Sequence, residues 1–191
     1  MIWIISGALL AGAIVFLILE ARGKRTTISL SFKGDLKRES AFLQQYGQSV
    51  CTPLVAWLAG IAARDWRPFV LVCAAVLANS FSVFILKKLF GRVRPNRENA
   101  GKFTGFSFKH DNKKESFPSS HSACAFALSA ALIQIWPEAA IVWWTLAGLT
   151  AFLRYAMEAH FPSDILAGCA WGLVVGHTTY IYLAQLLGQP A

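Results

Sequence analysis

Long apolar runs alternate with short polar connections along most of this chain. A bilayer core of about 30 Å needs about 20 helical residues. Because a helix satisfies its own backbone hydrogen bonds in lipid, such runs favour helices over barrel strands. The pattern predicts an all-α integral membrane bundle of six transmembrane helices, built on charge-free runs at residues 2–19, 49–63, 68–86, 122–136, 139–153 and 165–187.

Several of these runs are shorter than a full span. We expect residues 42–48 to lengthen the second, and residues from Phe117 onward to lengthen the fourth. The first run has no basic residue before it, and Glu20-Ala21-Arg22 is a poor cleavage site. We therefore expect a retained first span and a single membrane domain over residues 1–191.

Two further patterns concern packing. Residues 26–48 place apolar side chains among charges at roughly helical spacing, which fits an interfacial helix after the first span or a solvated loop equally well. In the last run, Gly168, Gly172 and Gly176 recur every four residues. Such a stripe of small residues lets another helix approach closely.

Composition and charge agree with a membrane protein that meets anions. Apolar residues make up 55% of the chain and charged residues 15%, too little charge to cover a soluble fold. The net charge is +8, with six cations over residues 22–38 and nine over residues 87–114. With six spans, both regions lie on one side of the membrane. The spans argue against nucleic acid as the partner and favour lipid headgroups or a phosphorylated substrate.

Three polar clusters lie on this basic side, at residues 87–95, 117–121 and 153–164. Lys87, Arg94 and Arg154 supply fixed positive charge, and an arginine fork matches phosphate oxygens. Ser119 and Ser120 lie where the fourth helix is expected to start, so their backbone N–H groups and the helix dipole can hold an anion.

The same clusters contain two imidazoles and a carboxylate. His160 and His121 titrate near neutrality, and Asp164 follows His160 by four residues at the expected start of the sixth helix. The carboxylate can accept a hydrogen bond from one imidazole nitrogen and leave the other free to attack. Together with the cations, these groups predict a phosphoryl-transfer site.

Each cluster alone has a simpler interpretation. Lysines and arginines at the ends of spans usually extend to headgroups, and we expect this of Lys88, Arg92 and Arg97. His177, inside the last span, is expected to make a packing hydrogen bond. The three clusters in order on one membrane face carry the prediction.

The sequence resembles the type 2 phosphatidic acid phosphatase superfamily over residues 87–164. Its three motifs are Lys, six residues, Arg-Pro; Pro-Ser-Gly-His; and Ser-Arg, five residues, His, three residues, Asp. This chain departs at Ser120, where the family usually has Gly, and at Leu153, where it usually has Ser. The positions that match are Lys87, Arg94, Pro95, Pro118, Ser119, His121, Arg154, His160 and Asp164.

The resemblance implies roles for these residues. His160 would attack phosphorus, oriented by Asp164, and His121 would protonate the departing lipid oxygen. Lys87, Arg94, Arg154 and the Ser119–Ser120 amides would stabilise the phosphoryl oxygens. It also implies that no metal or other cofactor is needed.

The resemblance and the charge pattern leave several points open. Candidate substrates are phosphatidic acid, phosphatidylglycerol phosphate and polyprenyl phosphates or diphosphates. A phosphotransferase using the same site and a non-catalytic binder of anionic lipid are the alternatives. Loop charge favours a cytoplasmic site, whereas bacterial relatives usually face the periplasm, and we expect the periplasmic side of a bacterial inner membrane. The sequence leaves the oligomeric state open.

Overall fold

The computed structural model describes residues 1–28, 30, 33–48, 50–107 and 115–188. Within them the chain is helical, without strands, as predicted, and two isolated bridges order the loop after α4. The elements are α1 (Ile2–Ala21), α2 (Gly34–Leu43), η1 (Gln44–Gly47), α3 (Cys51–Ala63), α4 (Arg67–Phe90), α5 (Ser120–Ile135), η2 (Pro137–Ala139), α6 (Ala140–Ala156) and α7 (Pro162–Leu186).

All six predicted apolar runs form helices. Among the described residues, four helical segments are long and apolar enough to cross a membrane: α1, α4, α7, and η2 with α6. The helices α3 and α5 are shorter, with 13 and 16 residues. The chain therefore has the architecture of an integral membrane protein, and the count of six spans stays a prediction.

The expected extensions of the second and fourth helices are wrong. Ser119 has extended backbone as the N-cap of α5, so the helix begins at Ser120 and not near Phe117. Pro118 precedes this cap, and its ring disfavours helical backbone at Phe117. Likewise, Gln48 is extended and separates η1 from α3.

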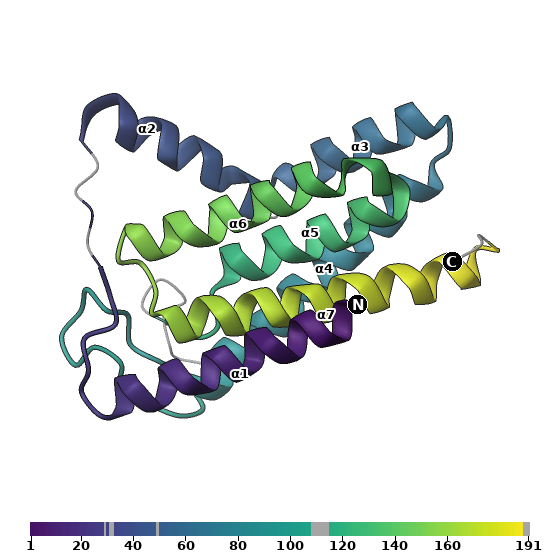
Figure 1. Ribbon diagram of the computed structural model, residues 1–191. Helices are drawn as coiled ribbons and strands as arrows, with labels where there is room; N and C mark the ends of the chain where they lie inside the picture. Colours follow the sequence, from purple (N-terminus) through teal and green to yellow (C-terminus); the bar gives the residue numbers. More distant parts are fainter. Residues whose placement is uncertain (29, 31–32, 49, 108–114, 189–191) are drawn as a thin grey trace.

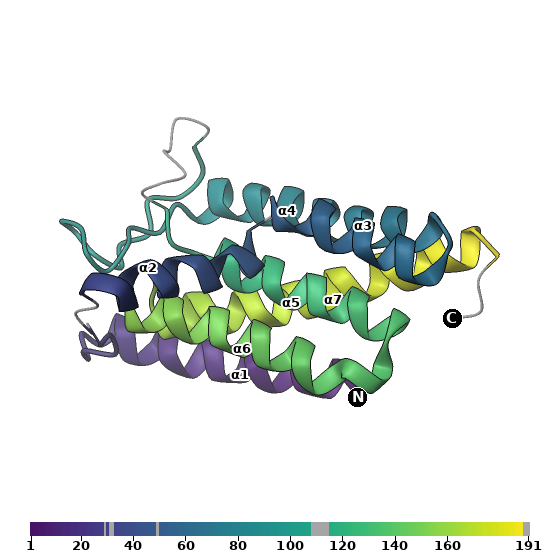
Figure 2. The ribbon, with the colours of Figure 1, turned by 90° about the horizontal axis from the view of Figure 1, so that it is seen from above.

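The helices pack side by side along one direction, with α7 in contact with α1, α4 and α5 (Figures 1 and 2). The glycine stripe makes the α5–α7 contact possible. A Cβ atom on Gly172 would lie 2.1 Å from the carbonyl oxygen of Ala123, and one on Gly176 would lie 2.6 Å from that of Ala127. Close backbone approach along this stripe, as predicted, leaves no room for side chains.

Apolar side chains both fill the bundle and cover its outside. Leu71, Leu128, Leu132 and Leu173 are fully buried. Large apolar side chains are exposed along α1, α3, α4 and α6. An apolar outer surface of this extent fits a lipid environment. Within α7, the predicted packing role of His177 is confirmed by its 3.4 Å contact with Gln134.

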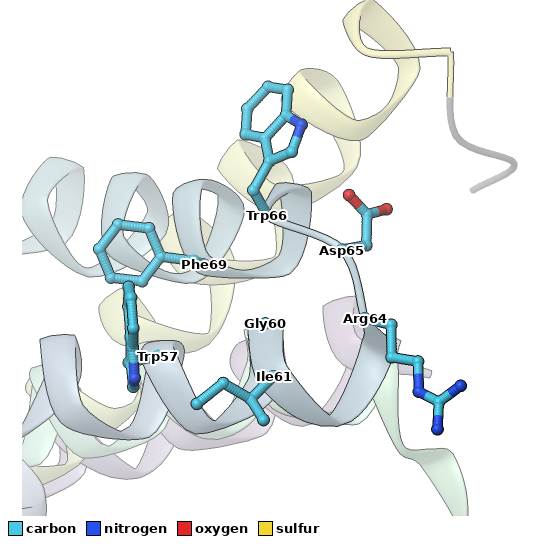
Figure 3. Close-up of a pocket in the computed structure, with 7 residues that line it drawn as sticks. All are labelled: Trp57, Gly60, Ile61, Arg64, Asp65, Trp66 and Phe69. Carbon is cyan, nitrogen blue, oxygen red and sulfur yellow. The ribbon is translucent and has the colours of Figure 1, made fainter.

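The two ends of the bundle differ in chemistry. At one end, a pocket of about 370 Å³ between α3 and α4 includes three aromatic side chains in its lining, and Trp57 meets Phe69 edge to face (Figure 3). At the other end lie α2 and the longer connections (Figure 1). Residues 34–43 thus form the helix, while its place at the lipid interface stays a prediction. The second end holds the polar clusters.

Candidate active site

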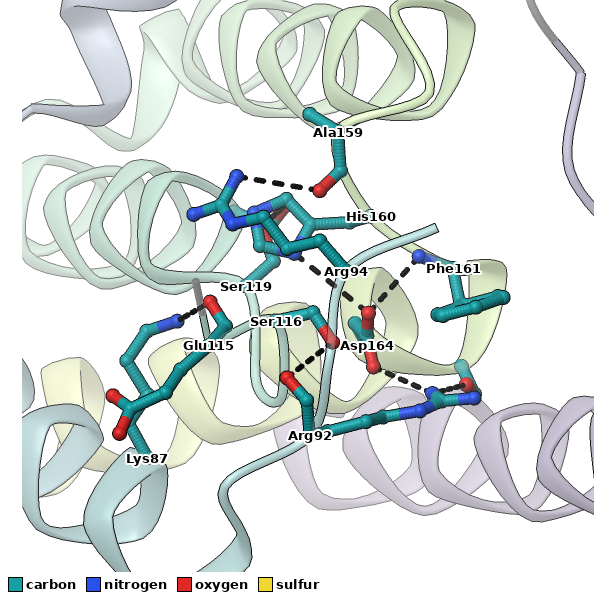
Figure 4. A network of polar contacts seen from close by, with 12 residues as sticks. Lys87, Arg92, Arg94, Glu115, Ser116, Ser119, Ala159, His160, Phe161 and Asp164 are labelled. Carbon is teal, nitrogen blue, oxygen red and sulfur yellow. Dashed lines mark hydrogen bonds and ion pairs between the residues drawn. The ribbon is translucent and has the colours of Figure 1, made fainter. Parts of the chain in front are cut away.

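His160 occupies a buried position between α6 and α7. Its side chain is 1% exposed, and the α7 helix begins two residues later with Pro162 at its first turn. Asp164, fully buried, accepts a hydrogen bond from the Phe161 amide at 2.9 Å (Figure 4). The carboxylate thereby caps α7 and is held close to the imidazole.

The contact between His160 and Asp164 is looser than a hydrogen bond. His160 Nδ1 lies 3.7 Å from Asp164 Oδ2, beyond the range of an N–H···O bond. Among the described residues, Nδ1 has no hydrogen-bond partner. Catalytic hydrogen bonds are often long in the absence of substrate. Nδ1 therefore faces the Asp164 carboxylate, and Nε2 is the ring nitrogen that this carboxylate does not engage.

The three predicted phosphate-binding cations are each anchored by a neutral oxygen. Lys87 Nζ donates to the Glu115 carbonyl at 3.0 Å, and Arg94 Nη1 donates to the Ala159 carbonyl at 3.3 Å (Figure 4). Arg154 Nη1 donates to the side-chain oxygen of Gln44 at 2.6 Å. Within the part of the chain that the structure describes, none of the three cations forms an ion pair with a carboxylate.

Two of these cations also carry donors without an acceptor. The Nε groups of Arg94 and Arg154 are buried and have no hydrogen-bond partner among the described residues. A buried donor left unpaired costs about 1–3 kcal/mol. Within the same residues Arg92 also has an unpaired Nε group, so the uncompensated charge, and not the unpaired donors, marks a site that fits an incoming anion.

Electrostatics link the cations to both imidazoles. Burial, followed by the charges of Lys87, Arg94 and Arg154 and by His121, holds the pKa of His160 well below its ordinary value of 6.5. Burial lowers the pKa of Arg94 as well. His121 lies in the first turn of α5 at this same end. His160 is therefore neutral near pH 7, the form in which an imidazole is a nucleophile.

Ser119 and Ser120 differ in the hydrogen-bond donors that they can provide to a phosphate. The Ser119 amide donates to the Asp164 carbonyl at 3.0 Å, and the Ser119 hydroxyl accepts from Ser122 at 3.0 Å. The Ser119 amide is therefore unavailable to phosphate, which corrects that expectation. Ser120 is the first residue of α5, where amides lack intrahelical partners. The Ser120 amide stays a predicted donor.

Sequence reasoning missed two buried cations. Lys88 and Arg92 were expected to reach the headgroups, and this is wrong, whereas Arg97 is exposed. Lys88 pairs with Glu115 at 3.3 Å. Arg92 is 2% exposed and pairs with Asp164 Oδ1 at 2.6 Å and with Glu20 Oε2 at 2.9 Å. A signal was present in Glu20, an acidic residue directly after a long apolar run.

The described residues contain no group of three or more His, Cys, Asp or Glu side chains placed to hold a metal ion. The absence of a metal requirement stays a prediction of the family resemblance.

The class defined by the fold and site is an integral membrane helix bundle with a buried histidine near three cations at one end. The sequence model of the PAP2 superfamily matches residues 68–187, and the chain belongs to this superfamily. The match includes every predicted site residue and excludes α1, α2 and α3.

Relatives with named activities are found among bacterial lipid phosphatases. The chain is 33% identical over 118 residues to a lipid A 1-phosphatase of Rhizobium johnstonii, covering 61% of this chain and 46% of that protein. It is 34% identical over 102 residues to a lipid A 1-phosphatase of Rhizobium etli, covering 53% and 42%. The matched segments span less than half the length of either relative.

A solved structure has the same fold. The crystal structure of a transmembrane PAP2-type phosphatidylglycerolphosphate phosphatase from Bacillus subtilis superposes with a TM-score of 0.61. The two sequences are 17% identical, and the match covers 97% of this chain and 93% of that chain. This likeness extends the shared fold to α1, α2 and α3.

Proposed function

We propose that this chain hydrolyses a lipid phosphate monoester or diphosphate through a covalent phosphohistidine at His160. One observation carries the proposal: three cations that form no ion pair with any described carboxylate lie around a neutral, buried imidazole at one end of a membrane bundle. The relatives named as lipid phosphatases support the same reaction class.

In the first step, His160 Nε2 attacks phosphorus. A nitrogen–phosphorus bond forms, the bond from phosphorus to the lipid oxygen breaks, and His121 donates a proton to that oxygen. Lys87, Arg94 and Arg154 hold the non-bridging oxygens, where the transition state spreads its charge. Asp164 stabilises the positive charge that develops on the imidazole.

In the second step, water attacks the phosphohistidine. His121, now neutral, accepts a proton from that water, and the phosphorus–nitrogen bond breaks. Inorganic phosphate leaves and His160 returns to its neutral form. The low pKa of His160 favours this return, because a weakly basic imidazole is a better leaving group.

A groove next to the site supports a lipid as the substrate. It lies between α1, α6 and α7, has a volume of about 350 Å³, and is lined almost entirely by apolar side chains. Tyr155 and Pro162 form part of its wall, and in sequence they flank His160. A hydrocarbon chain in this groove would place its phosphate close to the cations.

We place the active site on the periplasmic side of a bacterial inner membrane. The charge count favoured the cytoplasm, but Lys87, Lys88, Arg92, Arg94 and Arg154 are engaged inside the bundle end. Cations held in a site are poor markers of orientation. Labelling of a single cysteine placed within residues 97–107, in intact cells, tests the assignment.

The purified chain in detergent, with chelator present, is the material for the test of activity. Phosphate release is measured from phosphatidic acid, phosphatidylglycerol phosphate, lipid A 1-phosphate and polyprenyl diphosphate. We expect release from at least one substrate and a loss of at least about 10³-fold in His160→Ala. Transfer to another acceptor without free phosphate would indicate a phosphotransferase, and binding without release would indicate a lipid-binding protein.

A further inference from the structure

Arg92 forms a junction between the first helix and the reacting pair. Its Nη1 group donates to Asp164 Oδ1 at 2.6 Å and to the Ser163 hydroxyl at 2.7 Å (Figure 4). Its Nη2 group donates to Glu20 Oε2 at 2.9 Å, and the Ser163 hydroxyl donates to the same carboxylate. One guanidinium therefore joins the end of α1 to the start of α7.

The guanidinium is held rigidly in place. It lies over the Phe161 ring at 4.1 Å from the centroid and over the Phe103 ring at 5.1 Å. The Arg92 carbonyl also accepts the Ser116 amide at 2.7 Å. A guanidinium fixed on its faces and at both ends is a precise support for whatever it contacts.

The contact with Asp164 fixes how the carboxylate is turned. Arg92 takes Oδ1, and the Phe161 amide takes Oδ2. With both oxygens assigned, Oδ2 is the atom that faces His160 Nδ1. Loss of Arg92 would free the carboxylate to rotate away from the imidazole.

The charges of Arg92, Glu20 and Asp164 also support a role in holding Asp164 for the imidazole. Asp164 and Glu20 are two buried carboxylates that share one guanidinium, so this network is net negative. It lies beside three cations that pair with no carboxylate in the part of the chain that the structure describes. Glu20 thus compensates Arg92, and Asp164 keeps negative charge for the imidazolium that forms in the reaction.

We propose that Arg92 and Glu20 are positioning residues for the Asp164–His160 pair, which makes the first helix a working part of the active site although the family match begins only at residue 68. The inference rests on the proposed function, because it assigns Asp164 a role in the reaction of His160. Neither residue is expected to touch the substrate. Both act through Asp164.

The test is a double-mutant cycle on the full-length chain, measured with the best substrate of the panel. We expect Arg92→Gln to lower kcat about 100-fold, as misplacement of a reacting group does, with KM within about threefold of wild type. In an Asp164→Asn background, the same change is expected to cost less than about threefold, because the group through which Arg92 acts is already lost.

Milder variants keep the test valid if Arg92→Gln fails to fold. Arg92→Lys preserves the charge and is expected to restore part of kcat. Glu20→Gln is expected to lower kcat about tenfold, and Glu20→Asp to restore part of the loss. Lys88→Gln is the matched control: it removes another buried ion pair at the same end of the bundle and is expected to keep kcat within about threefold of wild type.

The outcomes separate the two proposals. Equal losses from Arg92→Gln in the wild-type and Asp164→Asn backgrounds would show a merely structural role and overturn this inference. Unchanged kcat in folded Arg92→Gln and Glu20→Gln would overturn it as well, with the proposed function intact. A wild-type chain without activity on any lipid phosphate would instead remove the proposed function.

Discussion

Two sets of cations at the same end of the bundle differ in what they meet. Lys87 and Arg94 donate to backbone carbonyls, whereas Lys88, one residue from Lys87, and Arg92, two residues from Arg94, pair with buried carboxylates. The sequence places the two sets side by side, and all four side chains lie wholly or largely inside the protein. The acceptor that each cation meets separates a site for an incoming anion from a structural ion pair.

The physical consequences of the two environments are opposite. A buried charge that has lost its partner strongly destabilises the fold. A buried cation without a carboxylate carries a desolvation cost, and a bound anion offsets this cost. Removal of a cation from the first set should therefore reduce activity more than stability, and removal of Lys88 should do the reverse. Arg92 differs from Lys88 because its partner Asp164 faces His160, so removal of Arg92 should lower activity as well.

Arg94→Gln is the sharpest way to break the comparison. Loss of a donor to the transferring phosphoryl group is expected to lower kcat/KM about 10³-fold. The thermal unfolding temperature in detergent should stay equal or rise, because a desolvated charge is removed. An activity within threefold of wild type, in a protein that has lost stability, would place Arg94 in the structural set.

Lys88→Gln is the corresponding test of the second set of cations, which pair with carboxylates. It removes the ion pair between Lys88 and Glu115, whose side chain is 3% exposed. We expect the free energy of unfolding to fall by about 3 kcal/mol, with kcat changed less than about threefold. Denaturant or thermal unfolding beside phosphate release measures both quantities. A large loss of kcat with unaltered stability would contradict the division.

Gln44→Leu tests the anchoring of the first set by neutral acceptors. The Gln44 side-chain oxygen accepts from Arg154, and its amide donates to the Ser40 carbonyl at 3.0 Å. Because Arg154 would keep its charge and lose its orientation, we expect kcat/KM to fall about tenfold. Gln44→Glu would place a carboxylate beside Arg154, convert it to a compensated cation, and is expected to raise KM for the phosphate substrate.

The pH profile gives the smallest expected effect. The neutral form of His160 attacks, so its contribution to kcat/KM is complete at pH 6.5 and is lost only as the pH falls through its lowered pKa. Arg154→Gln removes one of the cations that lower this pKa. The acid limb should therefore move to higher pH. In Lys88→Gln the acid limb should stay in place.

Local pattern was sufficient to predict the helices and that the motif residues lie at one end of the bundle. Each of the six apolar runs forms a helix, and the motif positions from Lys87 to Asp164 meet at one end because alternate connections lie on one side. The start of α5 was predicted correctly at the serine pair, with Ser119 as the cap and Ser120 as the first helical residue, whereas the expected lengthening from Phe117 was wrong.

The errors within the site come from contacts between distant segments. Arg92 and Glu20 are separated by 72 residues, and no local pattern pairs them. The Ser119 amide is taken by the Asp164 carbonyl because α7 packs tightly on the start of α5, where a Cβ on Gly168 would lie 2.6 Å from the Ser119 carbonyl oxygen. Packing of this kind depends on the assembled bundle.

The stereochemical course at phosphorus tests the account most directly. Hydrolysis of a lipid phosphate that is chiral at phosphorus, followed by analysis of the released phosphate, reports the number of displacements. Attack by His160 followed by attack by water inverts the phosphorus twice, so the account predicts net retention of configuration. Net inversion would mean that water attacks the lipid phosphate directly and would contradict the covalent role of His160.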